Sequence, residues 1–145
     1  MTDLQSRLAE VERMIGKQVK LRRTVSESDI YLFCGISGDL HPNHIDEEYM
    51  KTTRFGQRIA HGGLTLAYMS GAITKAISDL RGTVVSYGFD NVRFRAPAFI
   101  GDTIETIYEI EEVRRDRAES RARVTCSKGA GILVTEATHI LKFLD

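Results

Sequence analysis

A long uncharged segment near the middle of the chain constrains the fold more than any other feature. Between residues 64 and 74 no side chain is charged, and the apolar pattern continues to Leu80. On a helix, apolar residues would cover nearly every face of this segment, and a helix that is apolar all round is buried in protein. A membrane span is a poorer interpretation, because the stretch 59–74 is short and contains His61 and three glycines. We therefore expect a buried central helix over 64–80.

The rest of the chain favours strands packed around that helix. A short amphipathic helix is expected over 4–14, and a second helix should begin at Ser26 or Ser28 and end near Gly35. Alternating or β-rich segments predict strands at 17–25, 83–94, 103–113, 121–127 and 132–144. Short connections suit antiparallel neighbours, so the sequence predicts an α+β fold in which a curved antiparallel sheet wraps around a long buried central helix. That arrangement is the hotdog fold.

Composition bounds the organisation and the partners of the chain. Its 145 residues fit one domain, 1–145, without repeats or linkers, and 20 basic residues balance 20 acidic ones, so a nucleic-acid surface is not indicated. Cys34 and Cys126 are too few for a disulfide framework or a four-cysteine zinc site. The N-terminal segment lacks the apolar core of a signal peptide, which predicts a cytoplasmic protein. An apolar helix on one small sheet leaves surface to cover, which favours a homodimer or a higher homo-oligomer.

One loop carries an acid–base pair. In the segment SGDLHPNHID, Asp39 and His44 lie five residues apart around a turn at Pro42. A carboxylate and an imidazole held by one loop can bind the same water, and imidazole exchanges protons near neutral pH. Taken alone, such a pair is weak evidence for catalysis, because an aspartate in a turn often only binds backbone N–H groups.

A second element lies directly before the central helix. The residues AHGG occupy positions 60–63, and free N–H groups at a helix N-terminus can stabilise the oxygen of a thioester as it becomes an enolate. Gly62 and Gly63 also permit a tight turn into the helix, and the two interpretations are compatible.

Taken together, three blocks resemble one family. GDLHPNHID, AHGGL and FRAPAFIGDTI occur in the order typical of the MaoC-like family, and specifically of its (R)-specific enoyl-CoA hydratases. The resemblance covers most of the chain and implies a hydro-lyase of fatty acid metabolism that converts trans-2-enoyl thioesters and (R)-3-hydroxyacyl thioesters into each other. It implies Asp39 and His44 as the catalytic pair, the Gly62 backbone N–H as the oxyanion donor, and Ser70 as a further active-site residue. His41 departs from the family pattern, which commonly has asparagine at that position.

The same resemblance bears on cofactors and partners. It implies no metal and no redox cofactor, and the substrate would carry CoA or the phosphopantetheine of an acyl carrier protein. Four arginines near the motifs are candidates for binding CoA phosphates: Arg54, Arg58, Arg93 and Arg95.

Two other functions stay open at the level of sequence. Hotdog proteins also include acyl-CoA thioesterases, but a thioesterase would typically carry a carboxylate near the central helix, and 64–75 contains none. A protein that binds acyl thioesters without turning them over is the third candidate, although that role leaves Asp39, His44 and Gly62 unexplained.

Overall fold

The structure is a computed structural model that describes residues 3–145. The elements, in chain order, are α1 (Leu4–Glu12), β1 (Gln18–Thr24), α2 (Glu27–Ser37), α3 (Pro42–Ile45), α4 (Glu47–Lys51), α5 (Gly62–Ile77), β2 (Val84–Phe94), β3 (Thr103–Arg114), β4 (Glu119–Lys128) and β5 (Ile132–Phe143). A 3₁₀ turn at Arg115–Arg117 joins β3 to β4. None of the described helices is long and apolar enough to cross a membrane.

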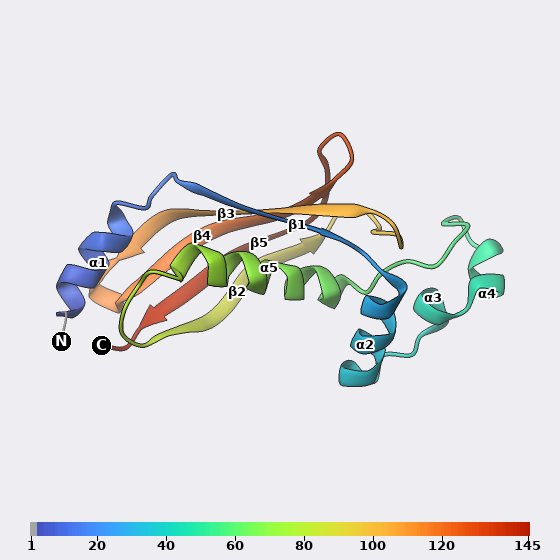
Figure 1. Cartoon of the computed structure of the whole chain (residues 1–145), viewed down its shortest axis with the longest axis horizontal. Coiled ribbons are helices and arrows are strands. Elements are labelled where there is room, and N and C mark those ends of the chain that lie inside the picture. The colour runs from blue at the N-terminus through green and yellow to red at the C-terminus, as the bar shows by residue number, and fades with distance from the viewer. Residues whose placement is uncertain (1–2) are drawn as a thin grey trace.

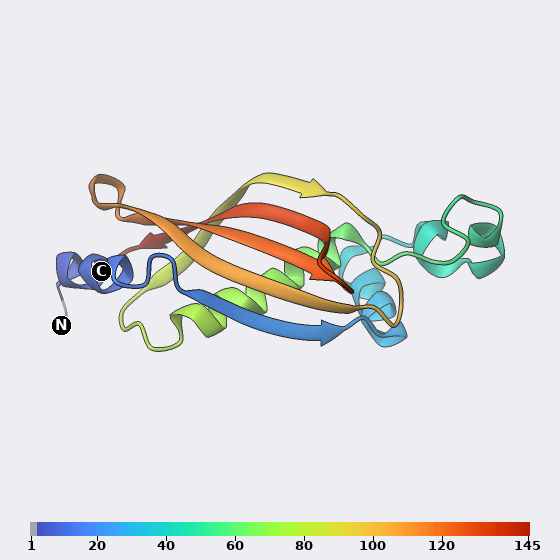
Figure 2. The ribbon, with the colours of Figure 1, turned by 90° about the horizontal axis from the view of Figure 1, so that it is seen from above.

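Five antiparallel strands form one curved sheet in the order β1-β3-β4-β5-β2. The sheet bends around α5, which lies along its concave face (Figures 1 and 2). Side chains alternate along a strand, so every second residue of β3 points toward the helix; Ile104, Tyr108 and Ile110 are buried there. The α+β hotdog architecture expected from the sequence is confirmed.

Helix α5 buries one face and exposes the other. Leu64, Tyr68, Met69 and Ala72 lie against the sheet. The opposite side carries small residues that are exposed in this single chain: Ala67, Ser70, Gly71 and Thr74. The expected burial all round therefore holds for one face only, because a single sheet covers one side of a helix.

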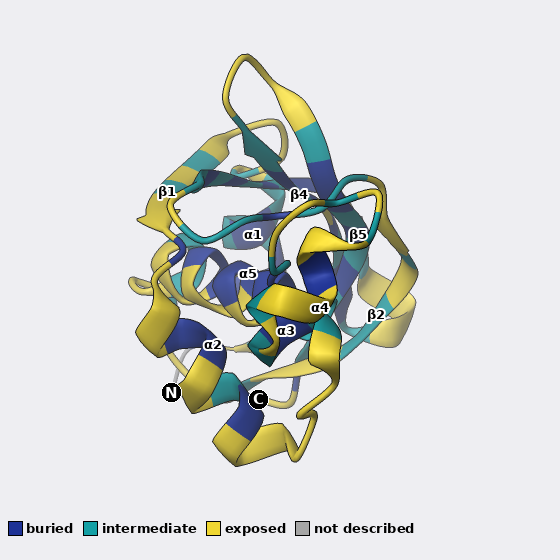
Figure 3. Cartoon of the chain, turned by 90° about the vertical axis from the view of Figure 1, so that its right-hand side faces the viewer, coloured by how far each residue is buried: buried dark blue, intermediate teal, exposed yellow. Residues whose placement is uncertain are grey.

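The segment between β1 and α5 projects past the end of the sheet (Figure 1). Helix α2 begins with a capping box, in which Ser26 and Asp29 bind each other's backbone N–H groups, and it ends at Gly38, whose φ of 75° suits glycine. The helix thus continues past the expected end at Gly35. The following loop contains the short helix α3, and the outer sides of α2 and α4 are largely exposed (Figure 3).

Candidate active site

Asp39 and His44 lie together at the projecting end of the molecule. Asp39 follows Gly38, and its Oδ1 accepts a 3.3 Å hydrogen bond from the His41 N–H. His44 belongs to α3, which Pro42 begins and the His41 side chain caps. The Asp39 side chain is 49% exposed and that of His44 only 11%, with 3.7 Å between Asp39 Oδ2 and His44 Nε2. The structure therefore brings the two predicted residues side by side, one facing solvent and one largely enclosed.

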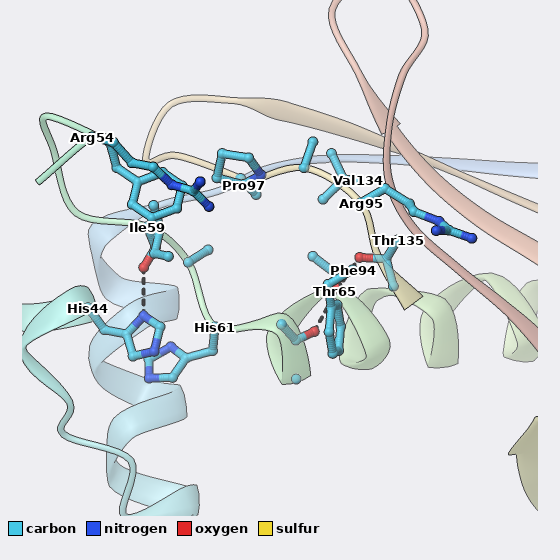
Figure 4. A pocket seen from close by; sticks show the side chains of 16 residues that line it. His44, Arg54, Ile59, His61, Thr65, Phe94, Arg95, Pro97, Val134 and Thr135 are labelled. Carbon is cyan, nitrogen blue, oxygen red and sulfur yellow. Dashed lines mark hydrogen bonds between the residues drawn. The ribbon is translucent and has the colours of Figure 1, made fainter. Parts of the chain in front are cut away.

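Hydrogen bonding fixes which nitrogen of His44 carries the proton. Nδ1 lies 2.7 Å from the Ile59 carbonyl oxygen, which can only accept, so the ring donates through Nδ1 (Figure 4). In the neutral ring Nε2 then has a free lone pair directed toward the Asp39 carboxylate. Two acceptors 3.7 Å apart do not bind each other, but one water can donate a hydrogen to each of them.

Burial shapes the proton affinity of His44. It lowers the pKa of His44 below the usual 6.5, the bond to the Ile59 carbonyl raises it, and the nearby His61 ring lowers it further. Smaller effects come from Asp39, which raises this pKa, and from His41, which lowers it. The net direction keeps His44 neutral, as a proton acceptor must be, at physiological pH.

Gly62 begins α5 beside the pair. As the first helical residue its N–H has no partner within the helix, and the side chain of His61, the preceding N-cap residue, does not cap this end. A Cβ at Gly62 would lie 2.8 Å from the Phe94 ring, and one at Gly63 would lie 2.6 Å from the Phe33 ring. A residue with a Cβ at either position would displace an aromatic ring. The tight turn and the open approach to the backbone N–H groups therefore both depend on glycine at these two positions.

A cavity of about 400 Å³ opens next to these groups. His44 and His61 line one part of it, and Phe94 lines another (Figure 4). Gly62 also belongs to the lining. The exposed side chains of two arginines, Arg54 and Arg95, also line it. The cavity therefore joins the histidine of the acid–base pair, a helix N-terminus and positive charge, while Asp39 lies outside its lining.

Two buried threonines complete the lining. Thr65 Oγ1 lies 2.7 Å from both the Gly62 carbonyl oxygen and Thr135 Oγ1 (Figure 4). Both hydroxyls are buried and paired, so they need no ligand to satisfy them. The sequence analysis did not identify either residue; a threonine on the apolar stripe of α5 was the available signal.

Ser70 lies apart from this cavity. It is exposed on the uncovered flank of α5, two turns beyond Gly62, and does not line the pocket of the single chain. Its predicted role as a substrate contact stays a prediction.

The three polar side chains of the site are poorly arranged for a metal. Ligand atoms of Asp39, His44 and His61 lie within 4.8 Å of one another. However, the two imidazole rings are stacked, with 3.7 Å between centroids and 26° between planes. Imidazole binds a metal through an in-plane lone pair, and stacked rings keep their lone pairs in two separate, nearly parallel planes, which disfavours their meeting at one ion. The rings would have to turn apart before both could bind one ion.

The chain is similar to known proteins of one family. Residues 10–130 match the family model described as MaoC like domain. An (R)-specific enoyl-CoA hydratase of Rhodospirillum rubrum is 36% identical over 124 residues, which cover 85% of this chain and 84% of the relative. A 3-hydroxybutyryl-CoA dehydratase of Methylorubrum extorquens is 35% identical, covering 83% of this chain and 74% of the relative.

Two solved structures have the same fold as this chain. The R-hydratase PhaJ1 from Pseudomonas aeruginosa superposes with a TM-score of 0.78 at 30% identity, covering 90% of this chain and 82% of that one. An (R)-hydratase from A. caviae gives a TM-score of 0.81 at 22% identity, covering 90% and 96% of the two chains.

Proposed function

The chain belongs to the MaoC-like domain family, and from this we propose that it is a hydro-lyase that hydrates trans-2-enoyl thioesters to (R)-3-hydroxyacyl thioesters or runs the reverse dehydration. The names of its relatives, an enoyl-CoA hydratase and a 3-hydroxybutyryl-CoA dehydratase, support both the reaction and the substrate class.

The observation that carries the mechanism is the 3.7 Å gap between His44 Nε2 and Asp39 Oδ2. In the proposed reaction a water donates one hydrogen to each of these atoms, which leaves an oxygen lone pair to attack C3 of the enoyl group. One proton of the water passes to the pair, and the pair returns a proton to C2 on the same face. The water is thereby added across the double bond, with no net gain or loss of electrons by the protein.

The thioester oxygen gains negative charge during this addition. We place it at the N-terminus of α5, where the Gly62 N–H is free of an intrahelical partner and the helix dipole favours an anion. The close approach of Phe94 and Phe33 to the two glycines supports this placement, because any larger residue would narrow the entry.

The carrier part of the substrate would meet Arg54. Arg58 is bound to both Glu27 and Glu47, each at 2.7 Å, and Arg95 is bound to Glu136 at 2.6 Å. Within the described part of the chain neither Arg54 nor Arg93 has a carboxylate partner, but Arg93 does not line the cavity, whereas the Arg54 guanidinium lies over the Phe55 ring there. A guanidinium that is not neutralised suits the phosphates of CoA or phosphopantetheine.

This assignment can be tested with two substrates. Arg54→Ala should raise KM for crotonyl-CoA several-fold but leave crotonyl-pantetheine, which has no phosphate, unaffected. Equal effects on both substrates would exclude a phosphate contact.

A thioesterase is the alternative that needs a direct test. Helix α5 carries no carboxylate along its length, which disfavours hydrolysis. We would follow the absorbance of crotonyl-CoA and, in parallel, the release of free thiol from a saturated acyl-CoA. Loss of absorbance without thiol release supports the hydratase, and thiol release supports the thioesterase. If neither occurs while CoA thioesters still raise the melting temperature, the chain is a binding protein.

We further propose that the chain forms a homodimer or a larger homo-oligomer. β2 is an edge strand, and three of its apolar side chains are exposed: Val85, Tyr87 and Phe94. An exposed edge with apolar side chains is a template for pairing with a second chain. Light scattering after gel filtration tests this, and a monomeric mass would refute it.

A further inference from the structure

His61 contacts both members of the acid–base pair. Its ring stacks on that of His44 with 3.7 Å between centroids, and its Nε2 lies 3.0 Å from the Asp39 backbone carbonyl oxygen. The residue is only 2% exposed; Cys34 Sγ lies 3.6 Å from the same nitrogen, and the Phe33 ring lies 4.7 Å away between centroids. His61 is therefore fixed by packing and is in position to fix its neighbours.

The contacts also define the tautomer of His61. The Asp39 carbonyl can only accept, so Nε2 carries the proton. Nδ1 is buried and has no hydrogen-bond partner among the described residues. The buried ring is thus held by the Nε2–H hydrogen bond and by its stacking on His44.

We propose that His61 is a positioning residue that holds Asp39 and His44 as one unit and keeps His44 in its neutral, proton-accepting form. Its hydrogen bond to the Asp39 carbonyl fixes the start of the catalytic segment, and its stacked ring fixes the plane of the His44 imidazole. The role rests on the function proposed above, in which these two residues share one water.

Electrostatics at His44 follow from the same arrangement. The titratable groups that face it are Asp39, His41 and His61, and Arg54 also lines the cavity. Burial and the neighbouring His61 both lower the pKa of His44. Replacing the His61 ring by a smaller polar group removes a neighbour and admits water, and both changes favour the protonated form of His44.

Two substitutions separate the two contacts. His61→Gln keeps a donor near the ε position but loses the ring, so the acid limb of the kcat/KM profile should move to higher pH by about 0.5–1 unit. His61→Phe keeps a ring but loses the donor, so kcat should fall about 10–100-fold through misplacement of Asp39, with little change in KM. Cys34→Ala is the matched control. It removes the thiol that lies 3.6 Å from His61 Nε2 but keeps the His61 ring and its bond to Asp39, so the pH profile should be unchanged.

Folded His61→Gln and His61→Phe proteins whose kcat and pH profile match the wild type would overturn the proposal. A measurement on the wild-type protein avoids the risk that a variant fails to fold. Nitrogen chemical shifts of ¹⁵N-histidine-labelled wild type should show the Nε2-protonated tautomer for His61 and the Nδ1-protonated tautomer for His44, and the opposite tautomer at His61 refutes the geometry. This spectrum needs no substrate, so it stands even if the wild type fails to hydrate crotonyl-CoA, which would refute the proposed function instead.

Discussion

Replacing Asp39 by asparagine tests the shared water most directly. The asparagine keeps an Oδ1 acceptor for the His41 N–H, so that 3.3 Å hydrogen bond survives. The side chain is 49% exposed and makes no direct bond to the neutral His44 ring, so loss of its charge should cost at most about 1 kcal/mol of stability. The variant should therefore fold normally, with a melting temperature only a few degrees from that of the wild type.

The chemistry should respond far more than the stability. The new amide replaces an acceptor by a donor opposite the free lone pair of His44 Nε2, so it competes with the water for that atom. Loss of a positioned acid–base group costs about 10²–10⁴-fold in rate, which is about 3–5 kcal/mol of barrier. The assay is the decay of enoyl-thioester absorbance with crotonyl-CoA.

Asp46→Asn is the matched control. Asp46 lies in the same projecting segment and caps α4 through its Oδ1, which accepts a 2.8 Å bond from the Tyr49 N–H. Asparagine caps a helix equally well, and the charge change is identical. An Asp39→Asn enzyme as active as Asp46→Asn, to within about tenfold, would refute the shared-water reasoning.

Three other predictions concern the glycine entry, the buried hydroxyls and a buried histidine. Gly62→Ala should lower hydration about tenfold or more by placing Cβ 2.8 Å from the Phe94 ring, and a second change, Phe94→Ala, should restore most of it; no rescue would contradict steric crowding. Thr65→Val should cost about 1–3 kcal/mol in urea unfolding by leaving the Thr135 hydroxyl without its 2.7 Å partner, and the double valine variant should cost less than the sum of the two single ones. Burial lowers the pKa of His139 from 6.5 to about 4, so its stabilising contribution is complete above pH 6.5 and is lost as the pH falls toward 4. Wild-type unfolding free energy should fall by up to about 3 kcal/mol across that range, and an equally steep fall in His139→Gln would exclude this residue as the cause.

Local pattern predicted the elements well where they are long. The uncharged run forms α5, and each β-rich segment forms a strand. These elements are long, and because each of them packs against the core, the same apolar pattern recurs over many of its residues. The end of α2 was predicted less well. Both Gly35 and Gly38 can end a helix, and only Gly38 takes the left-handed conformation that does so. Helix α3 is four residues long, too short for any periodic signal.

The sequence indicated some of the residues that lie together in the candidate site, but not the contacts between them. Asp39, His44 and Gly62 belong to recognisable blocks of sequence. The stacking of His61 on His44 brings together rings seventeen positions apart, and the Ile59 carbonyl that fixes the tautomer has no side-chain signal at all. The Thr65–Thr135 pair likewise joins a helix to a distant strand. Such contacts depend on tertiary geometry, which no local pattern encodes.

Within the projecting segment, α3 and α4 have few direct contacts with the sheet and α5, whereas Ile30 and Cys34 of α2 belong to the buried core. The C-terminal end of the segment is tied to the loop before β3 by the Ala60 N–H, which donates a 2.7 Å bond to the Ala98 carbonyl, and Arg58 joins α4 to α2 through ion pairs. Polar links at a surface weaken as salt rises, whereas the sheet and α5 are held by apolar burial. We therefore expect α3 and α4 to open at a lower free energy than global unfolding requires, and amide exchange along these two helices would measure that opening. Because His44 lies on α3, each such opening would carry its imidazole away from the cavity, and raised ionic strength should lower the fraction of molecules with an intact site.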